Sequence, residues 1–254
     1  MKTASVVAVL ITAAFTCMID AQSPAPRING KPDLSGLWQS ERTPMSEYAK
    51  ALPPQMLVVQ PDFNDVTKHF VNVFWDMNPA DWPVRPEAAA ISDERQKSGR
   101  DFQTAYCLPG SLPAALVTMN FKMIQTPKEV VVISGNGDPA RQIPIGRSLP
   151  KDPLPSWMGT SVGRWDGDTF VVETTGFNER AWLDAFGHPR SEHMRITERY
   201  RRRDATHMDL DVSFDDAKYY TRPFGFKTTL TRLSDDHVFE YVCTENEKDA
   251  AHTK

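Results

Sequence analysis

The strict alternation of apolar and polar residues in the C-terminal half is the feature that most constrains the fold. Over residues 207–214 every second side chain is apolar, and the intervening ones are polar or charged. The same pattern runs over residues 193–200, except that Glu198 stands on the apolar side. A period of two belongs to a β-strand with one buried face, whereas an amphipathic helix repeats every ~3.6 residues. This half of the chain is therefore predicted to be built from β-strands.

Turn signals divide the C-terminal half into neighbouring strands. Residues 166–168 (Asp-Gly-Asp) separate two β-rich runs, and a short Asp-Gly turn in that position is a strong hairpin signal. Similar short polar breaks occur at residues 127–128, 135–138, 204–205 and 234–236. With residues 34–38 this makes about ten strands, the last being residues 237–243 paired with residues 226–233. We predict an all-β fold, an antiparallel up-and-down barrel of about 8–10 strands; an open sandwich of the same strands is the alternative.

The first 21 residues have the features of a secretory signal peptide. Lys2 supplies the positive charge, residues 4–17 form an apolar stretch of suitable length, and Ala21 is a small residue suited to cleavage. The stretch is shorter than the ~20 residues that a membrane-spanning helix needs. We expect a periplasmic or secreted protein whose mature chain has no integral membrane segment. Cys17 follows Phe-Thr, a poor match to a lipoprotein cleavage site, and its lipidation stays open.

The remainder of the chain is predicted to form one domain preceded by a flexible lead-in. Residues 22–32 are Pro-rich and polar, which suits the lead-in, and residues 33–254 form the domain. Within it, residues 40–118 are aromatic, Pro-rich and irregular, with a helix signal that starts at Glu87 and ends near Gly99. We expect this segment to be an irregular, partly helical N-terminal insertion that covers the barrel.

Charge and motifs argue against several classes of partner. The net charge is −4 and the isoelectric point about 5.9, so nothing favours nucleic acid or an anionic membrane surface. No nucleotide-binding loop, flavin fingerprint or haem-attachment motif occurs, and no cysteine or histidine group has metal-ligand spacing. We expect no cofactor, no metal and no nucleic-acid partner. The oligomeric state stays open.

If the protein is exported, its cysteines can form a disulfide. Removal of residues 1–21 leaves Cys107 and Cys243, which then lie in an oxidising compartment. We predict a disulfide between them, which would close a long loop and contribute about 4–5 kcal/mol in the chain-entropy model. Two unpaired buried thiols are the alternative.

Three carboxylates, Glu173, Glu198 and Glu240, stand among apolar neighbours. If they face the barrel interior, each is costly to bury unless a cation pairs with it. Arg141 and Arg147 are the candidate partners, because a guanidinium can hold a carboxylate with two hydrogen bonds. One interpretation is an internal ion-pair network. The other is a cavity in which Arg141, Arg147 and Glu240 bind a ligand and a carboxylate of raised pKa acts as general acid or base.

The loop over residues 184–193 is the richest in residue types used in catalysis. His188 exchanges a proton near neutral pH, and Asp184 can fix its tautomer. We expect this loop at the rim of the barrel, where loops meet ligands. His188 and Asp184, with Glu173 or Glu198, are therefore the candidate catalytic residues. A polar surface loop is the alternative.

Aromatic side chains are frequent in the insertion, among them Trp75 and Trp82. They suit the apolar mouth of a ligand pocket and are candidate ligand-binding residues. Equally, they can simply dock the insertion on the barrel.

Residues 159–163 match the Gly-x-Ser-x-Gly pattern of serine hydrolases. That motif needs a strand before the serine and a helix after it, whereas here a loop with Pro and Trp precedes and a strand is expected to follow. Ser161 is therefore expected at the start of a strand and not as a nucleophile.

Residues 36–38 (Gly-Leu-Trp) resemble the Gly-x-Trp signature that opens many lipocalins. From residue 141 to residue 246 the chain resembles a widespread family of exported, largely uncharacterised proteins of environmental bacteria. In that family a Cys-x-Pro element (here residues 107–109) precedes the barrel and a Glu-Tyr-x-Cys element (residues 240–243) ends it. The resemblance implies export and a lipocalin-like (calycin-type) barrel. It implies no activity, and residues 40–105 depart from it.

Three functional hypotheses follow. The first is an exported barrel that binds a small, partly apolar molecule in its cavity. The second is a cofactor-free acid–base enzyme on the same barrel, a lyase, isomerase or hydrolase. The third is a structural or interaction module whose interior is filled by side chains. An interior packed with side chains argues against the first two.

Overall fold

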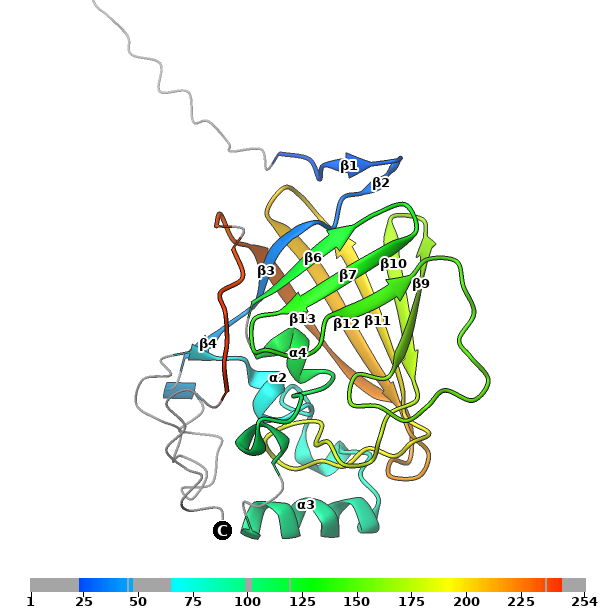
Figure 1. Ribbon diagram of the computed structural model, residues 1–254. Coiled ribbons are helices and arrows are strands. Elements are labelled where there is room, and N and C mark those ends of the chain that lie inside the picture. Colours follow the sequence, from blue (N-terminus) through cyan, green and yellow to red (C-terminus); the bar gives the residue numbers. More distant parts are fainter. Residues whose placement is uncertain are drawn as a thin grey trace, which may run out of the picture.

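The computed structural model describes residues 23–44, 46–47, 65–98, 102–118, 120–235 and 237–243. Within them, one nine-stranded antiparallel sheet forms the body of the protein, and short helices gather at one end of it (Figure 1). The expected signal peptide, residues 1–21, lies outside the described residues. None of the helices in the described ranges has the length and apolar character needed to cross a membrane.

The large sheet curls into a nearly closed barrel, with the strand order β8-β7-β6-β3-β13-β12-β11-β10-β9. Its strands are β3 (Gly36–Ser40), β6 (Phe121–Gln125), β7 (Glu129–Ser134), β8 (Arg141–Pro144), β9 (Thr160–Asp166), β10 (Thr169–Thr175), β11 (Arg195–Arg202), β12 (His207–Asp215) and β13 (Phe224–Arg232). The two edges meet where Ile145, just after β8, bridges Gly163 on β9. Starting from β3, the strands follow one another around the barrel in chain order, and the last of them, β13, pairs with β3. The predicted antiparallel up-and-down barrel is confirmed.

The predicted alternation decides which side chains fill the barrel. On β12, Met208, Leu210, Val212 and Phe214 are all buried, and the residues between them reach solvent. Glu198 on β11 stands opposite Val212 and is fully buried, so it faces the interior with the apolar side of its strand. Inward-facing side chains from opposite walls pack into one hydrophobic core.

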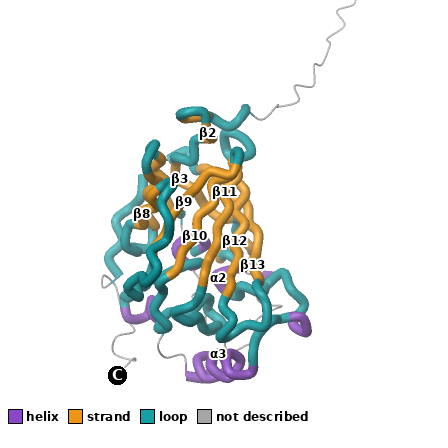
Figure 2. The backbone as a smooth tube through the Cα atoms, turned by 90° about the vertical axis from the view of Figure 1, so that its right-hand side faces the viewer, coloured by secondary structure: helices purple, strands orange, loops and turns teal. Residues whose placement is uncertain are grey.

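Shorter elements close the two ends of the barrel. They are β1 (Arg27–Ile28), β2 (Lys31–Pro32), β4 (Thr43–Pro44), β5 (Asp65–Val66), α2 (Lys68–Val71), η2 (Pro79–Asp81), α3 (Pro86–Ser98), η3 (Gln103–Tyr106) and α4 (Ala114–Val117). The helices lie at one end and the β1–β2 hairpin at the other (Figure 1), and α3 runs across the helical end (Figure 2). The α3 helix begins at Pro86, where a missing N–H costs no helical hydrogen bond. The partly helical insertion is thus present as predicted.

The C-terminal segment departs from the prediction. Residues 237–243 do not form a strand, so the expected pairing with residues 226–233 is wrong. The reason is that the available edge of β13 is taken by β3, with Leu230 opposite Ser40. Residues 237–243 instead lie outside the sheet (Figure 1), and Phe239 is 70% exposed.

Candidate functional site

A buried polar group lies inside the barrel. Arg141 on β8 donates to both carboxylate oxygens of Glu198, at 2.8 and 2.7 Å. Arg141 also donates to the hydroxyl oxygens of Ser161 on β9, at 2.8 Å, and Thr174 on β10, at 2.6 Å. The Tyr200 hydroxyl donates to Glu198 Oε2 at 2.6 Å. All five side chains are buried, so four strands meet in one hydrogen-bonded network.

The electrostatics of this network keep Arg141 charged and the Tyr200 phenol protonated. Burial lowers the pKa of Arg141, but the charge and hydrogen bonds of Glu198 more than offset this and the pKa is raised overall. Burial, followed by the charge of Glu198, raises the pKa of Tyr200 well above its ordinary value, so the phenol stays a donor. Every guanidinium nitrogen of Arg141 already has an acceptor. The geometry therefore matches the ion-pair network interpretation and leaves no guanidinium nitrogen without a partner for a ligand to use.

The Gly-x-Ser-x-Gly segment belongs to the same wall of the barrel. Ser161 lies on β9 with its hydroxyl in the network, as a strand residue and not on a strand-to-helix turn. A Cβ atom on Gly163 would come within 2.3 Å of the Phe170 ring, so glycine is needed where this wall meets the filled core.

The structure brings His188 and Asp184 together. His188 Nδ1 lies 2.6 Å from Asp184 Oδ2, and the same oxygen accepts a hydrogen bond from the Val73 backbone N–H at 2.8 Å. The imidazole packs edge-on against Phe74 and Trp82, at centroid distances of 4.8 and 5.7 Å. Both partners are buried, so the alternative of a polar surface loop is wrong for this pair. The pair links the loop after β10 to the insertion, and it lines none of the three pockets described below.

The two candidate tryptophans of the insertion are half-buried. Trp82 stacks on Phe74 at a centroid distance of 5.3 Å, and its Nε1 donates to the backbone oxygen of Met77 at 3.4 Å. Trp75 and Trp82 do not line any of the three pockets. Trp82 stacks on Phe74, which packs against Phe224 on β13 at a centroid distance of 4.6 Å, and this matches the alternative in which the tryptophan docks the insertion on the barrel.

A cleft at the helical end of the barrel has the features of a binding site. Its volume is about 440 Å³, and it is lined by Arg95, Tyr106, Leu108, Trp157, Arg180 and Trp182. The Arg95 guanidinium lies over the Trp182 ring, and the Arg180 guanidinium over the Trp157 ring, each 5.1 Å from the ring centroid. Trp182 is buried, and its indole Nε1 has no hydrogen-bond partner. We call this site the arginine–tryptophan cleft.

A buried cation supports one wall of the arginine–tryptophan cleft. Arg190 is fully buried and donates to the backbone oxygens of Trp157 and Asn178, both at 3.0 Å, and to the Ser111 hydroxyl. These acceptors are all neutral, and no carboxylate among the described residues pairs with Arg190. Burial, followed by the positive charge of Arg95, lowers the pKa of Arg190 to about 9, which leaves it charged at neutral pH. Three arginines, Arg95, Arg180 and Arg190, thus line or support the cleft.

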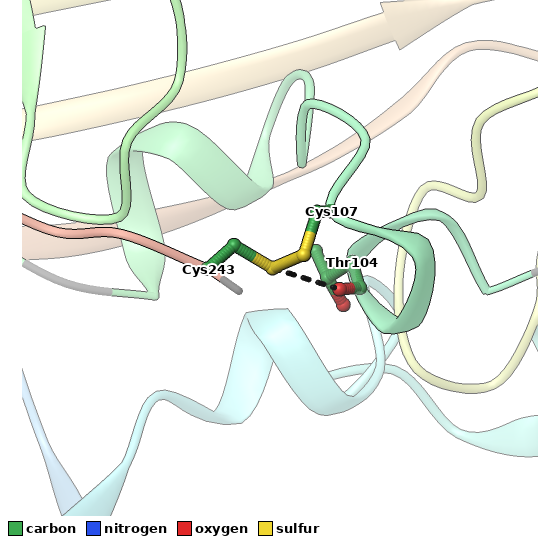
Figure 3. Close-up of a disulfide and its surroundings, with 3 residues drawn as sticks. All are labelled: Thr104, Cys107 and Cys243. Carbon is green, nitrogen blue, oxygen red and sulfur yellow. Dashed lines mark hydrogen bonds between the residues drawn. A yellow bond between two sulfur atoms is a disulfide. The ribbon is translucent and has the colours of Figure 1, made fainter. Parts of the chain in front are cut away.

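The predicted disulfide joins Cys107 to Cys243, with an S–S distance of 2.02 Å (Figure 3). Cys107 follows η3, and its two chain neighbours, Tyr106 and Leu108, line the arginine–tryptophan cleft. The bond thus ties residues 237–243 to one wall of that cleft.

A second pocket, of about 430 Å³, lies on the outer face of β9 and β10 beneath residues 147–151. Arg147 and Glu173 both line it, so two of the candidate residues meet here and not inside the barrel. Glu173 points outward because its neighbours Val172 and Thr174 are the buried, inward-facing residues of β10. An inward position for Glu173 is therefore wrong. Glu240 is also outside, exposed within residues 237–243.

A third pocket, of about 340 Å³, lies on the outer face of β11, β12 and β13 and is lined mainly by charged residues. These charges pair across the strands: Arg201 with Asp209 at 2.6 Å, and Lys227 with Asp211 at 3.1 Å. Opposite charges on neighbouring strands stabilise a solvated sheet face. Among the described residues, no group of three or more histidine, cysteine or acidic side chains gathers in a metal-binding arrangement.

Together these features define the class of protein: a nearly closed, nine-stranded antiparallel barrel, consistent with the lipocalin-like kind, with a loop-built cleft at its helical end. No protein-family model matches the chain, and no curated protein matches it significantly. The family resemblance of the sequence therefore stays a prediction.

Proposed function

We propose that the protein binds a small anionic molecule with an aromatic or apolar body in the arginine–tryptophan cleft. The observation that carries the proposal is the pairing of two tryptophan rings with two arginines around one cleft. Its volume of about 440 Å³ falls in the usual range of small-molecule sites, roughly 300–1,000 Å³.

The barrel interior is the weaker candidate for this site. Large side chains such as Trp38, Phe121 and Phe170 fill it with the core, and its charged pair is internally satisfied. A ligand that entered there would have to displace the bond between Arg141 and Glu198, and a buried charge left without its partner is costly. Binding at the loops leaves that network intact.

The lining side chains indicate the chemistry of the ligand. Arg180 can donate paired hydrogen bonds to a carboxylate, sulfonate or phosphate. Arg95, whose Nη1 already donates to the Gly187 backbone oxygen at 3.0 Å, adds positive charge beside it. Trp157 and Tyr106 offer flat apolar walls to the ligand. The described residues that line the cleft include no carboxylate. An acidic group attached to an aromatic ring system suits this set of donors and walls.

The proposal can be tested with 8-anilino-1-naphthalenesulfonate, a fluorescent aromatic anion. We expect saturable binding that weakens at least about tenfold in Arg180→Ala and in Trp157→Ala, because each loses a direct contact. Arg201→Ala is the matched control, since Arg201 is an exposed arginine that pairs with Asp209 on the outer face. The neutral analogue N-phenyl-1-naphthylamine should bind more weakly than the anion. Equal affinity of the anion for all four proteins, measured where urea midpoints confirm folding, would contradict the proposal.

A further inference from the structure

Positive charge gathers on one part of the barrel surface although the chain as a whole is acidic. The groove on the outer face of β9 and β10 is lined by four basic side chains and one acidic side chain. The basic ones are Arg147, Lys151, Arg164 and Arg195, and the acidic one is Glu173. Since the net charge of the chain is −4, this local excess of positive charge runs against the average.

The basic side chains of this groove have no polar partner in the part of the chain that the structure describes. Among the described residues, none of the four makes an ion pair within 4.0 Å or a hydrogen bond through its side chain. On the adjoining face of β11–β13 the situation is reversed, because Arg199, Arg201 and Lys227 each pair with an aspartate at 2.6–3.1 Å. The cations of one face therefore have acidic partners, whereas those of the neighbouring groove have no ion-pair partner within the described ranges.

The register of the strands fixes the floor of the groove. Glu173 on β10 stands opposite Val162 on β9 and Thr197 on β11. On β9, Arg164 is two residues from Val162 and stands opposite Val171. On β11, Arg195 is two residues from Thr197, toward the opposite end of β10. The two arginines are therefore diagonal neighbours of Glu173 on opposite sides, about 7–8 Å away in such a sheet. Asp215 on β12 stands directly opposite Arg195 and is a second carboxylate beside this face, although it does not line the groove. Two carboxylates beside four cations still leave an excess of positive charge.

The covering loop is anchored at both ends. At its start, the Gly146 backbone N–H donates to the Gly163 oxygen at 2.8 Å. At its end, the Ser156 backbone N–H donates to the Gly176 oxygen at 3.0 Å, and a Cβ atom on Gly176 would meet the Pro153 ring at 2.7 Å. The loop therefore holds Arg147 and Lys151 over the sheet, facing the arginines of β9 and β11 across the groove.

We propose that this groove binds a small multivalent anion that carries phosphate or carboxylate groups. Four unpaired cations around a pocket of about 430 Å³ favour a compact ligand with several negative charges over a single one. Arginine holds both phosphate and carboxylate with paired hydrogen bonds, so both chemistries fit. Glu173 opposes negative charge at the floor and is suited to accept a hydrogen bond from a hydroxyl group of the ligand. The groove and the arginine–tryptophan cleft have no lining residue in common.

The test is isothermal titration of the full chain with tripolyphosphate and, separately, with citrate at low ionic strength. We expect saturable binding of at least one of them, weakened at least about tenfold in Arg164→Ala and Arg195→Ala and by added salt. Glu173→Gln should tighten binding several-fold, since it removes the negative charge that lines the groove. The tighter of the two probes identifies phosphate or carboxylate as the recognised group.

Arg201→Ala is the control, because it removes the same charge from the paired face and should leave both titrations unchanged. Binding of neither probe, or equal weakening by Arg164→Ala and Arg201→Ala, would overturn the proposal. The outcome is independent of the cleft: Arg164→Ala should leave 8-anilino-1-naphthalenesulfonate binding unchanged, and Arg180→Ala should leave tripolyphosphate and citrate binding unchanged.

Discussion

A buried histidine makes the stability of this protein depend on pH by an amount that can be worked out. His69 on α2 is 2% exposed and stacks on Phe226, with ring centroids 4.0 Å apart and 9° between the planes. Among the described residues neither ring nitrogen has a hydrogen-bond partner of good geometry, although Nε2 lies 3.3 Å from Asp76 Oδ2. Burial lowers the pKa of His69 from 6.5 to about 4. Asp76 and the Lys227 backbone act against burial and favour a higher pKa, but burial has the larger effect.

The sign of the effect follows from proton binding. Between pH 6.5 and about 4 the unfolded chain takes up a proton at His69 that the folded protein does not. The free energy of unfolding therefore falls as the pH falls through this window, and His69 adds no further loss below it. At about 1.4 kcal/mol for each pH unit, the depressed pKa corresponds to about 3 kcal/mol. His69→Phe keeps the ring stack and removes the titration.

The assay is urea unfolding of both proteins at about pH 7, 5.5 and 4, followed by tryptophan fluorescence. Other groups titrate in both proteins, so the quantity to compare is the stability of His69→Phe minus that of the wild type at each pH. This difference should grow by about 3 kcal/mol in favour of the variant between pH 7 and pH 4. A difference that stays constant over the whole range would refute the reasoning.

Two further predictions concern the buried ion pair and the disulfide. Glu198→Gln should lower the free energy of unfolding, measured in urea, by about 3–5 kcal/mol, because Arg141 stays charged and buried without its carboxylate. A loss below about 1 kcal/mol is typical of a solvent-exposed ion pair and would contradict a buried one. Cys107→Ser should lower it by about 2–5 kcal/mol and weaken 8-anilino-1-naphthalenesulfonate binding, since Tyr106 and Leu108 beside it line the cleft. Unchanged melting temperature and unchanged dye affinity together would contradict that role.

Local patterns predicted those features that depend on neighbouring residues along one strand. The alternation over residues 207–214 placed the apolar side of β12 inward, and the same alternation placed Glu198 inside the barrel. A buried carboxylate is costly unless a cation pairs with it, and Arg141 is that cation. The disulfide between Cys107 and Cys243 followed from there being two cysteines after the predicted leader.

Features that depend on distant partners could not be predicted in the same way. In the run of three apolar residues over 170–172, the side that faces inward is ambiguous, so the sequence left the orientation of Glu173 open. Residues 237–243 have strand-like composition, but β3 already occupies the edge that they would need.

The arginine–tryptophan cleft was missed because its residues come from separate segments, namely α3, η3 and the loops around Trp157 and Trp182. Loops have no regular spacing of apolar residues from which the side chains that come together could be predicted. Arg180, two residues before Trp182 in a predicted loop, was the signal that the sequence offered.

The central claim is that the ligand binds in the cleft at the helical end and not inside the barrel. The most direct measurement is a crystal structure of the protein with 8-anilino-1-naphthalenesulfonate bound. We predict aromatic density between Trp157 and Trp182, with the sulfonate on Arg95 or Arg180 and the bond between Arg141 and Glu198 unbroken. Density for the dye inside the barrel would contradict the account.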